Sequence, residues 1–457
     1  MALSFANFQA TEDYLASIVN YEWVLPGQQP ERAFKLDRVQ EAMDLLGMTS
    51  RDLPAIHVGG TKGKGSTVLM VDAILRAHGF HTGAFLSPHV SMVRERIRIE
   101  GEAVAEFEWI DGFNRIAPIL DEMTNRDRRL TYFEVTWILA LERFRYHKSD
   151  AMVIEVGMGG RLDCTNLIQP RVVVLTPISH DHTRILGKRI AQIAWDKSHI
   201  LKPGVLAVIS KQNRWARAEI LNRVSNYRIN TLWFGEDYEL IERDQGHQPE
   251  ILFDVRVKDA VFPDLRLTLI GAHQRHNAAV AVAATQCFLQ SMGRNLDPEL
   301  VHRALADVTI PGRLEWGHRD PDVLLDVAHN PASFKALTSV LTQWKGTRKI
   351  HAVVGFAKGK DSRKCLRILA PFVHDVTLVP NGTPRSQDPE KLLRMAREFG
   401  IEASKADDGV EVLKRWMETS GGDRRWMKTA GGDLILVAGS FPLVGACRNH
   451  LLSPLLL

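Results

Sequence analysis

Cysteine is scarce in this chain, and long apolar runs are missing. The 457 residues include four cysteines, which are widely spaced and form no C-x-x-C pair, so neither a disulfide scaffold nor a zinc site is indicated. No run approaches the roughly 18 consecutive apolar residues that span a bilayer. The first basic residue, Arg32, comes too late to head a signal peptide. We therefore expect a soluble protein of the reducing cytoplasm that uses no membrane.

A large excess of charge of one sign is also missing. The 58 basic and 54 acidic residues leave a net charge of +4, which is too small for a protein whose main task is to neutralise nucleic-acid phosphates. With 45% apolar and 25% charged residues, the composition is typical of a folded globular chain and excludes disorder. We expect no nucleic-acid partner, but a local anion site stays open.

Strand-like runs alternate with amphipathic segments in the first half of the chain. The segments 66–78 and 133–147 carry apolar residues at helical spacing and are long enough to cross over between parallel strands. This alternation predicts an α/β fold with a mostly parallel sheet. The predicted strands are Ala55–Val58, Ala84–Leu86, Ala151–Val156, Val172–Ile178 and Val205–Ser210.

A second strand series follows the break at Pro311-Gly312. It predicts a second, smaller α/β domain, and we place the two domains at residues 1–308 and 309–457. Thr231–Leu269 is predicted to form antiparallel hairpins at an edge of the first domain. A ten-residue echo across 415–433 is interpreted as a duplicated surface loop without assigned function. The strands of the second series are Val323–Asp326, Ile350–Phe356, Val376–Val379 and Leu434–Ala438.

A glycine-rich loop lies between the first predicted strand and the first predicted helix. Residues 59–67 read Gly-Gly-Thr-Lys-Gly-Lys-Gly-Ser-Thr. Glycines let backbone N–H groups turn around an anion, and the helix N-terminus adds partial positive charge. Lys64 would reach the outer phosphates, and Ser66 or Thr67 would contact magnesium. The loop predicts a phosphate site.

This loop departs from the Walker A pattern. Val58 stands where the first glycine of that pattern belongs, and Gly65 separates Lys64 from Ser66. A flexible turn without a ligand is the alternative. The strand before the loop and the helix after it favour the phosphate site.

Two further polar clusters follow predicted strands. Glu155 ends one strand and precedes a glycine-rich turn, and residues 179–182 (Ser-His-Asp-His) follow the next. Because carboxyl ends of parallel strands share one edge of the sheet, we expect Lys64, Glu155 and His182 to lie near each other. A histidine after a strand is more often a satisfied polar cap than a metal ligand. The convergence of three strand ends favours a metal site.

An ordered set of motifs is similar to the folylpolyglutamate synthases and dihydrofolate synthases, ATP-dependent amide ligases of the Mur ligase superfamily. The resemblance covers nearly the whole chain, and it depends on the order of the motifs more than on any one of them. In chain order the motifs are Gly60–Ser66, Ser87-Pro88-His89, Arg94–Ile97, Thr131–Glu134, Glu155–Gly157, Gly160–Asp163, Asp181–Thr183, His273-Gln274 with Asn277, Pro311–Glu315, and Asp326 with Ala328–Pro331.

The resemblance implies a Mur-ligase-like fold with an N-terminal P-loop ATP-binding domain of the central type and a smaller, Rossmann-like C-terminal domain. ATP and magnesium, with two metal sites possible, are the implied cofactors. Lys64, His182 and Lys197 are implied as catalytic. Nucleotide contacts are implied for Gly60, Thr61, Gly63, Lys64, Gly65, Ser66, Thr67, Asn277, Arg313 and Asp326, the last two from the second domain, so that ATP would sit between the domains. The implied metal ligands are Ser87, Glu155, His182 and, if it is carbamylated, Lys197.

The resemblance also implies the substrates and the reaction. ATP would convert a pteroate or glutamyl carboxylate into an acyl phosphate, which the amine of L-glutamate attacks. The implied acceptors are dihydropteroate and tetrahydrofolate with its polyglutamates, and relatives of this kind are monomers. Domain closure would shield the acyl phosphate from water. The positions implied to contact the pterin are Thr131, Tyr132, Phe133, Glu134, Leu162, Asp163 and Cys164.

Some residues depart from the family pattern or allow a structural interpretation. Lys62 stands where the family often has asparagine and adds positive charge near the triphosphate. Cys164 stands where alanine is common, and we expect a tolerated small thiol without a catalytic role. Arg313 could instead pin the interdomain linker, and Asp326 could cap the helix that begins near Pro331. For Lys197 the alternative is an ordinary surface lysine.

Two rival functions follow from the same residues. A cell-wall Mur ligase would carry a whole N-terminal domain for its nucleotide-linked precursor, and only 59 residues precede Gly60. A nucleotide-dependent switch without ligase activity would need no Arg313 or Asp326 in a second domain. Which folate acceptor is used stays open at this point.

Overall fold

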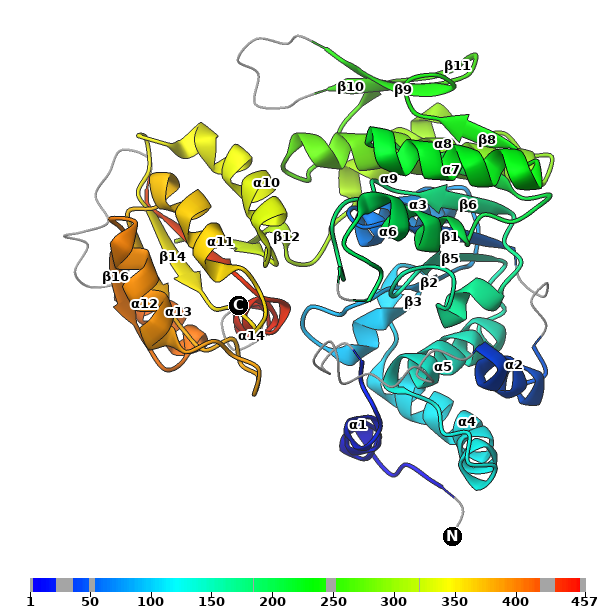
Figure 1. Ribbon diagram of the computed structural model, residues 1–457, viewed down its shortest axis with the longest axis horizontal. Helices are drawn as coiled ribbons and strands as arrows, with labels where there is room; N and C mark the ends of the chain where they lie inside the picture. The colour runs from blue at the N-terminus through cyan, green and yellow to red at the C-terminus, as the bar shows by residue number, and fades with distance from the viewer. Residues whose placement is uncertain are drawn as a thin grey trace. The chain divides into compact units, whose positions relative to one another are not determined.

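The computed structural model describes residues 3–21, 36–48, 54–183, 185–243, 252–319, 321–419 and 432–452. The chain divides into two compact units (Figure 1). Unit 1 comprises Met1–Pro88, Arg94–Thr268 and Gln274–Val308, and unit 2 comprises His89–Val93, Leu269–His273 and Thr309–Leu457. Within the described residues, no helix is long and apolar enough to span a membrane. Most of the ten-residue echo, residues 420–431, lies outside the described residues.

An eight-stranded sheet forms the centre of unit 1. The strands from β2 to β8 in the order below pair in parallel, whereas β3 and β4 add an antiparallel edge. The central strands are wholly buried, as expected for a parallel sheet covered on both faces. The order is β4 (Glu102–Ala103), β3 (Ile97–Ile99), β2 (Thr82–Phe85), β5 (Ala151–Glu155), β1 (Ala55–Gly59), β6 (Val172–Leu175), β7 (Leu206–Ile209) and β8 (Thr231–Trp233).

The helices of unit 1 cover this sheet and extend from it. Helix α3 packs on β1, β2 and β5, and α5 packs on β2. Asn213 caps α7, and Asp297 with Pro298 begins α9. The elements are α1 (Phe8–Ser17), α2 (Leu36–Leu45), α3 (Lys64–Ala77), η1 (Val93–Arg96), α4 (Glu106–Asn125), α5 (Tyr132–Tyr146), η2 (Cys164–Leu167), α6 (Ile190–Ser198), α7 (Arg214–Tyr227), α8 (Ala272–Gln290) and α9 (Pro298–Asp307).

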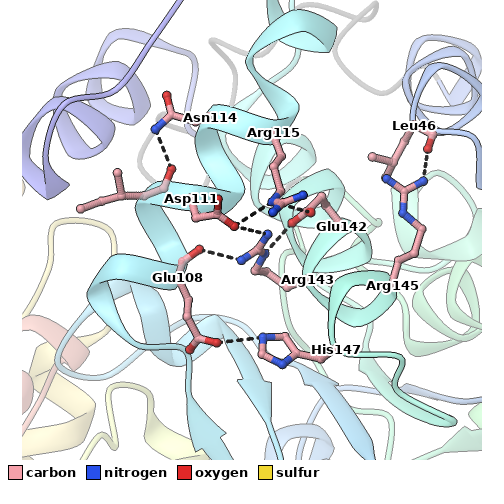
Figure 2. Close-up of polar contacts among 10 residues, drawn as sticks. Leu46, Glu108, Asp111, Asn114, Arg115, Glu142, Arg143, Arg145 and His147 are labelled. Carbon is pink, nitrogen blue, oxygen red and sulfur yellow. Dashed lines mark hydrogen bonds and ion pairs between the residues drawn. The ribbon is translucent and has the colours of Figure 1, made fainter.

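Helices α4 and α5 are joined by a polar network (Figure 2). The guanidinium of Arg143, whose side chain is 1% exposed, pairs with Glu142 at 2.5 Å and with Asp111 at 3.0 Å. It also donates to the carbonyl of Glu108 at 3.1 Å, and the carboxylate of Glu108 contacts His147 at 2.8 Å. A buried charge stays in a protein only when it is paired in this way. The network therefore fixes the helix pair whose second member begins at the predicted pterin segment.

The prediction for Thr231–Leu269 was partly wrong. Thr231–Trp233 is β8, and it pairs in parallel with β7 as the edge strand of the large sheet. Only the later strands are antiparallel, and they form a separate three-stranded sheet of β9 (Tyr238–Glu242), β10 (Phe253–Val257) and β11 (Ala260–Leu265). A three-residue strand is too short for its pattern of apolar and polar residues to show which strand it pairs with, or in which direction. The observed parallel pairing follows from the connection through α7, which crosses over between β7 and β8.

Unit 2 is a second α/β sheet with its own core. Its first strand is antiparallel to the second, and the remaining pairs are parallel. The strand order is β12 (Arg313–Arg319), β13 (Asp322–Asp326), β17 (Leu434–Ala438), β14 (Ile350–Val354), β15 (Asp375–Leu378) and β16 (Glu402–Lys405). The helices are α10 (Pro331–Leu341), η3 (Thr342–Trp344), α11 (Ser362–Leu369), η4 (Ala370–Phe372), α12 (Pro389–Glu398), α13 (Gly409–Thr419) and α14 (Phe441–Leu451).

Candidate functional site

The glycine-rich loop between β1 and α3 is tightly packed. Gly60 and Gly63 have φ angles of 135° and 85°, in the region that favours glycine. A Cβ atom at Gly60 would lie 2.0 Å from Oγ1 of Thr176, and one at Gly63 would lie 2.4 Å from Oδ1 of Asn277. These glycines are therefore required by close neighbours, which argues against a flexible turn.

Part of the loop's backbone is already used within the protein. The N–H groups of Thr61 and Lys62 donate to the carbonyl of Pro177 at 3.1 and 3.3 Å. The first intrahelical bond of α3 runs from Thr67 N to the carbonyl of Gly63. The N–H groups of residues 64–66 precede that bond, so they are the ones that the helix N-terminus offers to an anion.

Lys64 and Glu155 form an ion pair at the carboxyl edge of the sheet. Nζ of Lys64 lies 3.4 Å from Oε1 of Glu155, whose side chain is 5% exposed. The other oxygen, Oε2, accepts a hydrogen bond from the backbone N–H of Ser87 at 3.1 Å. Of the three strand-end residues that were expected to lie near each other, the structure thus brings Lys64 and Glu155 into contact, and it adds Ser87 to the pair.

These residues suit magnesium. Among the described residues, no three His, Cys, Asp or Glu side chains group around a possible metal position. Magnesium, however, is usually held by one or two carboxylates with phosphate oxygens and waters. Glu155 supplies a carboxylate, and Ser87 supplies a hydroxyl. Oγ1 of Thr67 and Oγ of Ser179 are buried without a hydrogen-bond partner in the described structure, which leaves two more oxygens beside the loop for a ligand.

His182 is less enclosed than the other predicted ligands. Its side chain is 45% exposed, and Nε2 lies 3.7 Å from Oδ2 of Asp181. Its φ angle is 45°, an uncommon value for a residue with a side chain. The backbone N–H of His182 donates to Oδ1 of Asp181 at 3.0 Å. The local turn therefore holds the histidine beside a carboxylate.

Lys197 is not an ordinary surface lysine. It lies in α6 with 3% of its surface exposed, and its Nζ donates to the carbonyl of Gly60 at 2.8 Å. Burial, with a further contribution from the charge of Lys64, lowers the pKa of Lys197 to about 8. The amine therefore touches the phosphate-type loop and exists partly in its neutral, nucleophilic form near neutral pH.

The first predicted pterin segment lies at the start of α5. The carboxylate of Glu134 accepts from the backbone N–H of Thr131 at 2.8 Å and pairs with Arg38 of α2 at 2.8 Å. The ring of Tyr132 lies under the guanidinium of Arg96. Phe133 packs so closely on Gly157 that a Cβ there would lie 2.5 Å from the Phe133 ring. The start of α5 thus adjoins the turn that follows Glu155.

The second predicted pterin segment continues from that turn. Leu162 is 36% exposed, whereas Asp163 and Cys164 are buried. The Asp163 carboxylate caps η2, because Oδ1 accepts from Thr165 N at 3.0 Å and Oδ2 accepts from Met158 N at 2.9 Å. Burial raises the pKa of the Cys164 thiol well above its ordinary value, so this cysteine is a poor nucleophile.

The remaining predicted nucleotide residues lie in different units. Asn277, in α8 of unit 1, contacts the loop at Gly63 and donates to Oε1 of Gln274 at 3.0 Å. In unit 2, Arg313 faces Asp326 across the β12–β13 pair and lies over the ring of Phe441. Within unit 1, the structure gathers the loop, Glu155, Ser87, Lys197 and Asn277 into connected contacts.

Asp326 is held by backbone groups at the end of β13. Its two oxygens accept from Leu314 N at 3.0 Å and Ala328 N at 2.9 Å. Burial raises the pKa of Asp326 to about 6, although Arg313 and these two bonds lower it. Asp326 does not cap the following helix, because the side chain of Asn330 is the N-cap of α10.

Sequence reasoning missed several residues that hold this region together. Arg38 binds Glu134 from 96 positions away, and Pro177 accepts two loop N–H groups. His57, inside β1, contacts Thr165 at 2.9 Å. One signal was available, since a histidine between Ile56 and Val58 interrupts an otherwise apolar strand. The other contacts join distant segments, and no local pattern predicts them.

Comparison with known families and proteins finds matches over most of the chain. The Mur ligase middle domain matches residues 58–285, and the Mur ligase glutamate ligase domain matches residues 312–441. A dihydrofolate synthase/folylpolyglutamate synthase of Mycobacterium tuberculosis is 32% identical over 462 residues, which cover 96% of this chain and 95% of that protein. A protein of the same name from Bacillus subtilis is 28% identical, with 91% of this chain and 94% of that protein covered.

Solved structures of related enzymes have a similar fold over nearly the whole chain. The structure of Mycobacterium tuberculosis folylpolyglutamate synthase complexed with ADP and AMPPCP is 30% identical, has a TM-score of 0.86, and covers 98% of both chains. Escherichia coli FolC in complex with DHPP and ADP is 26% identical, with a TM-score of 0.81 and 97% of both chains covered. The predicted Mur-ligase-like α/β fold is confirmed.

Proposed function

Because the chain belongs to the folylpolyglutamate synthase/dihydrofolate synthase family of Mur ligases, we propose that it is an ATP-dependent ligase that adds L-glutamate to a folate acceptor. Residues 1–308 act as the ATP-binding middle domain and residues 309–457 as the C-terminal ligase domain. The acceptors are dihydropteroate, tetrahydrofolate or both, and the enzyme works as a monomer in the cytoplasm. Four free, buried cysteines support a reducing compartment.

One structural observation carries this proposal. Strands β1 and β5 are parallel neighbours, and Val58 lies opposite Glu155. The loop Gly60–Gly63 leaves one of them and the segment Gly157–Cys164 leaves the other, so both emerge from the same sheet edge. A phosphate donor on the first segment and a pterin on the second are then neighbours, as a transfer between them requires.

The chemistry needs two bond-forming steps. A carboxylate oxygen of the acceptor attacks the γ-phosphorus of ATP, so that an acyl phosphate forms and ADP leaves. The amine of L-glutamate then attacks the acyl carbon, and the tetrahedral intermediate expels inorganic phosphate and leaves an amide. The amine loses one proton in the process. Excluding water protects the acyl phosphate from hydrolysis.

The residues of unit 1 divide this work. Lys64 neutralises charge on the transferring phosphoryl group, with the N–H groups at the start of α3. Asn277 borders the loop at Gly63 and would contact the nucleotide from there. Glu155, Ser87 and His182 would hold magnesium, which supplies further charge neutralisation when it is bound. Lys197, with its lowered pKa, is the residue for a second metal position if it is carbamylated.

The acceptor and the second unit complete the assignment. The pterin is bound by Thr131–Glu134 and Leu162–Cys164. Phe133 packs on Gly157, and the next residue, Met158, donates to Asp163, which supports one binding site for both segments. Arg313 and Asp326 are the nucleotide-holding residues of unit 2. Both lie at one end of the β12–β13 pair, where a guanidinium and a carboxylate can serve the charged and hydroxyl groups of a nucleotide.

Product mass tests the proposal. Purified protein is incubated with magnesium, ATP, L-glutamate and either dihydropteroate or tetrahydrofolate, and ADP and product mass are followed together. We expect a gain of one glutamyl residue on at least one acceptor, with one ADP per amide bond, and no product when glutamate is omitted. ADP formation without a glutamyl product from either acceptor would indicate that the enzyme uses another Mur-type substrate. Nucleotide binding without any turnover would indicate a switch protein.

A further inference from the structure

A buried histidine of β1 contacts Thr165, which directly follows the proposed pterin segment Leu162–Cys164. His57 lies in the middle of β1 with none of its surface exposed, and its strand neighbours Ile56 and Val58 are equally buried. Its Nε2 atom lies 2.9 Å from Oγ1 of Thr165, 108 positions later in the chain. Burying a polar ring in the centre of a parallel sheet costs free energy unless the ring is hydrogen-bonded.

The hydrogen-bond directions in this contact can be assigned. The hydroxyl of Thr165 has one hydrogen, and it donates that hydrogen to Oδ1 of Asp163 at 2.5 Å. Thr165 must then accept from His57, so Nε2 carries the proton. Nδ1 of His57 is buried without a hydrogen-bond partner in the described structure, which fits a ring that is protonated on Nε2 alone.

The protonation state agrees with this direction. Burial, assisted by the charge of Lys202, lowers the pKa of His57 to about 3. The ring is therefore neutral at every pH at which the enzyme is expected to work. A neutral ring with a fixed tautomer acts as a permanent hydrogen-bond donor and does not titrate with Asp163.

The hydrogen bonds that start at His57 end on the Asp163 carboxylate, which holds the segment 158–165 together. Asp163 accepts from Met158 N, Thr165 N and the Thr165 hydroxyl, so its bonds tie together the two ends of the segment 158–165. Aligned hydrogen bonds strengthen one another in a dry interior. His57 therefore bears on where the Asp163 carboxylate and the adjoining backbone of the segment lie.

We propose that His57 is a positioning residue for the folate acceptor, which it serves by orienting Thr165 and, through it, the Asp163 carboxylate. This role rests on the proposed function, because that function assigns Asp163 to the pterin. His57 touches no reacting group, so we expect it to affect the binding of the acceptor and not the chemical steps. The nucleotide loop, which leaves the same strand two residues later, is bonded to other partners, namely Pro177 and Lys197.

The test compares two substitutions of His57. His57→Leu removes the donor at similar volume, and His57→Gln retains an amide N–H near the position of Nε2. We expect His57→Leu to raise the KM for the folate acceptor about tenfold, as the loss of one buried hydrogen bond implies. The KM for ATP should change less than about twofold. His57→Gln should restore most of the acceptor affinity.

Two controls separate positioning from general damage. His78 is another buried histidine of unit 1, bonded to Ile74 and Asp297 instead of the loop. His78→Leu should lower the melting temperature without a selective rise in the acceptor KM. Thr165→Val breaks the same chain one step later, so the double variant His57→Leu/Thr165→Val should be no worse than Thr165→Val alone.

The outcomes distinguish this role from the proposed function. A parent enzyme that turns over neither acceptor overturns both. An active parent in which His57→Leu leaves the acceptor KM unchanged, raises both KM values equally, or adds fully to Thr165→Val overturns the positioning role alone. Nitrogen NMR of the His57 ring supplies an independent check, since a proton on Nδ1 at neutral pH would contradict the assigned direction.

Discussion

Each unit holds a buried carboxylate at the end of a parallel strand, and the two are held differently. Glu155 in unit 1 pairs with the Nζ of Lys64 and accepts one backbone N–H. Asp326 in unit 2 accepts two backbone N–H groups, yet burial still raises its pKa to about 6. The first carboxylate is paired with a cation that a phosphate can share. The second has a raised pKa, so it takes up a proton at a higher pH than an ordinary aspartate does.

This difference separates two tasks at the two sheet edges. In unit 1 the sequence places positive charge beside a carboxylate, which suits phosphoryl transfer and a divalent cation. In unit 2 the pKa of Asp326 is raised to about 6, so binding that depends on the charge of this carboxylate weakens as the pH falls through that value. We expect substitutions at the sheet edge of unit 1 to lower kcat. Substitutions at the sheet edge of unit 2 should change how kcat/KM for ATP depends on pH.

The largest effect is expected at Lys64. Lys64→Ala removes the charge that stabilises the transferring phosphoryl group, and kcat should fall about a thousandfold. Lys391→Ala, at an exposed lysine of α12, is the control and should stay within about threefold of the parent, as expected for a solvated charge. The measurement is steady-state ADP formation with saturating acceptor. Equal losses in the two variants would contradict the assigned role of Lys64.

A large effect on stability alone is expected away from both edges. Arg143→Met leaves Glu142, with a side chain 4% exposed, only its longer contact with Arg115 at 3.8 Å, and should lower the free energy of unfolding by about 4 kcal/mol. Arg394→Met, at a side chain that is 75% exposed, should cost less than about 1 kcal/mol. Urea denaturation of both variants provides the measurement. Below the melting temperature the kcat of each should match the parent, and a selective fall in the kcat of Arg143→Met would be evidence against this separation.

A smaller, pH-dependent effect is expected at Asp326. Because its folded pKa of about 6 exceeds the usual 3.8, ionisation weakens the fold as pH rises between these values. Relative to Asp326→Asn, the parent should lose up to about 3 kcal/mol of unfolding free energy between pH 4 and pH 7. The kcat/KM of the parent for ATP should decrease when the pH is lowered past about 6, and Asp326→Asn should lack this inflection.

The control for Asp326 lies at the other end of the same strand. Asp322 has a side chain 20% exposed and pairs with Arg348 at 2.9 Å. Asp322→Asn should keep the parent's inflection in kcat/KM near pH 6. If Asp326→Asn keeps it too, the inflection belongs to another group, and the contrast between the two units is lost.

The sequence was informative wherever function depends on residues close together in the chain. The glycine-rich loop, the carboxylate ending β5 and the buried parallel strands all have local patterns, and the structure places Lys64 and Glu155 side by side. The magnesium ligands and the nucleotide residues of unit 2 stay predictions. Their roles depend on contacts with a ligand, which a local sequence pattern does not encode.

Contacts between distant segments could not be predicted in the same way. The pairing of β8 with β7, the Arg38–Glu134 pair and the chain from His57 to Asp163 each join residues whose separation gives no periodic signal. Tertiary packing selects such partners, and the same side chains would suit many others. The N–H groups of Thr61 and Lys62 show the same limit, because the loop pattern suggests phosphate for them and the fold gives them Pro177.

An oxygen-label experiment tests most directly whether the two segments at the edge of unit 1 work on one reaction. The folate acceptor is prepared with ¹⁸O in both oxygens of the reacting carboxylate, and the inorganic phosphate formed with ATP and L-glutamate is analysed by mass. An acyl phosphate predicts that each phosphate carries one ¹⁸O atom, with the other retained in the amide. Unlabelled phosphate accompanying amide product would contradict the account.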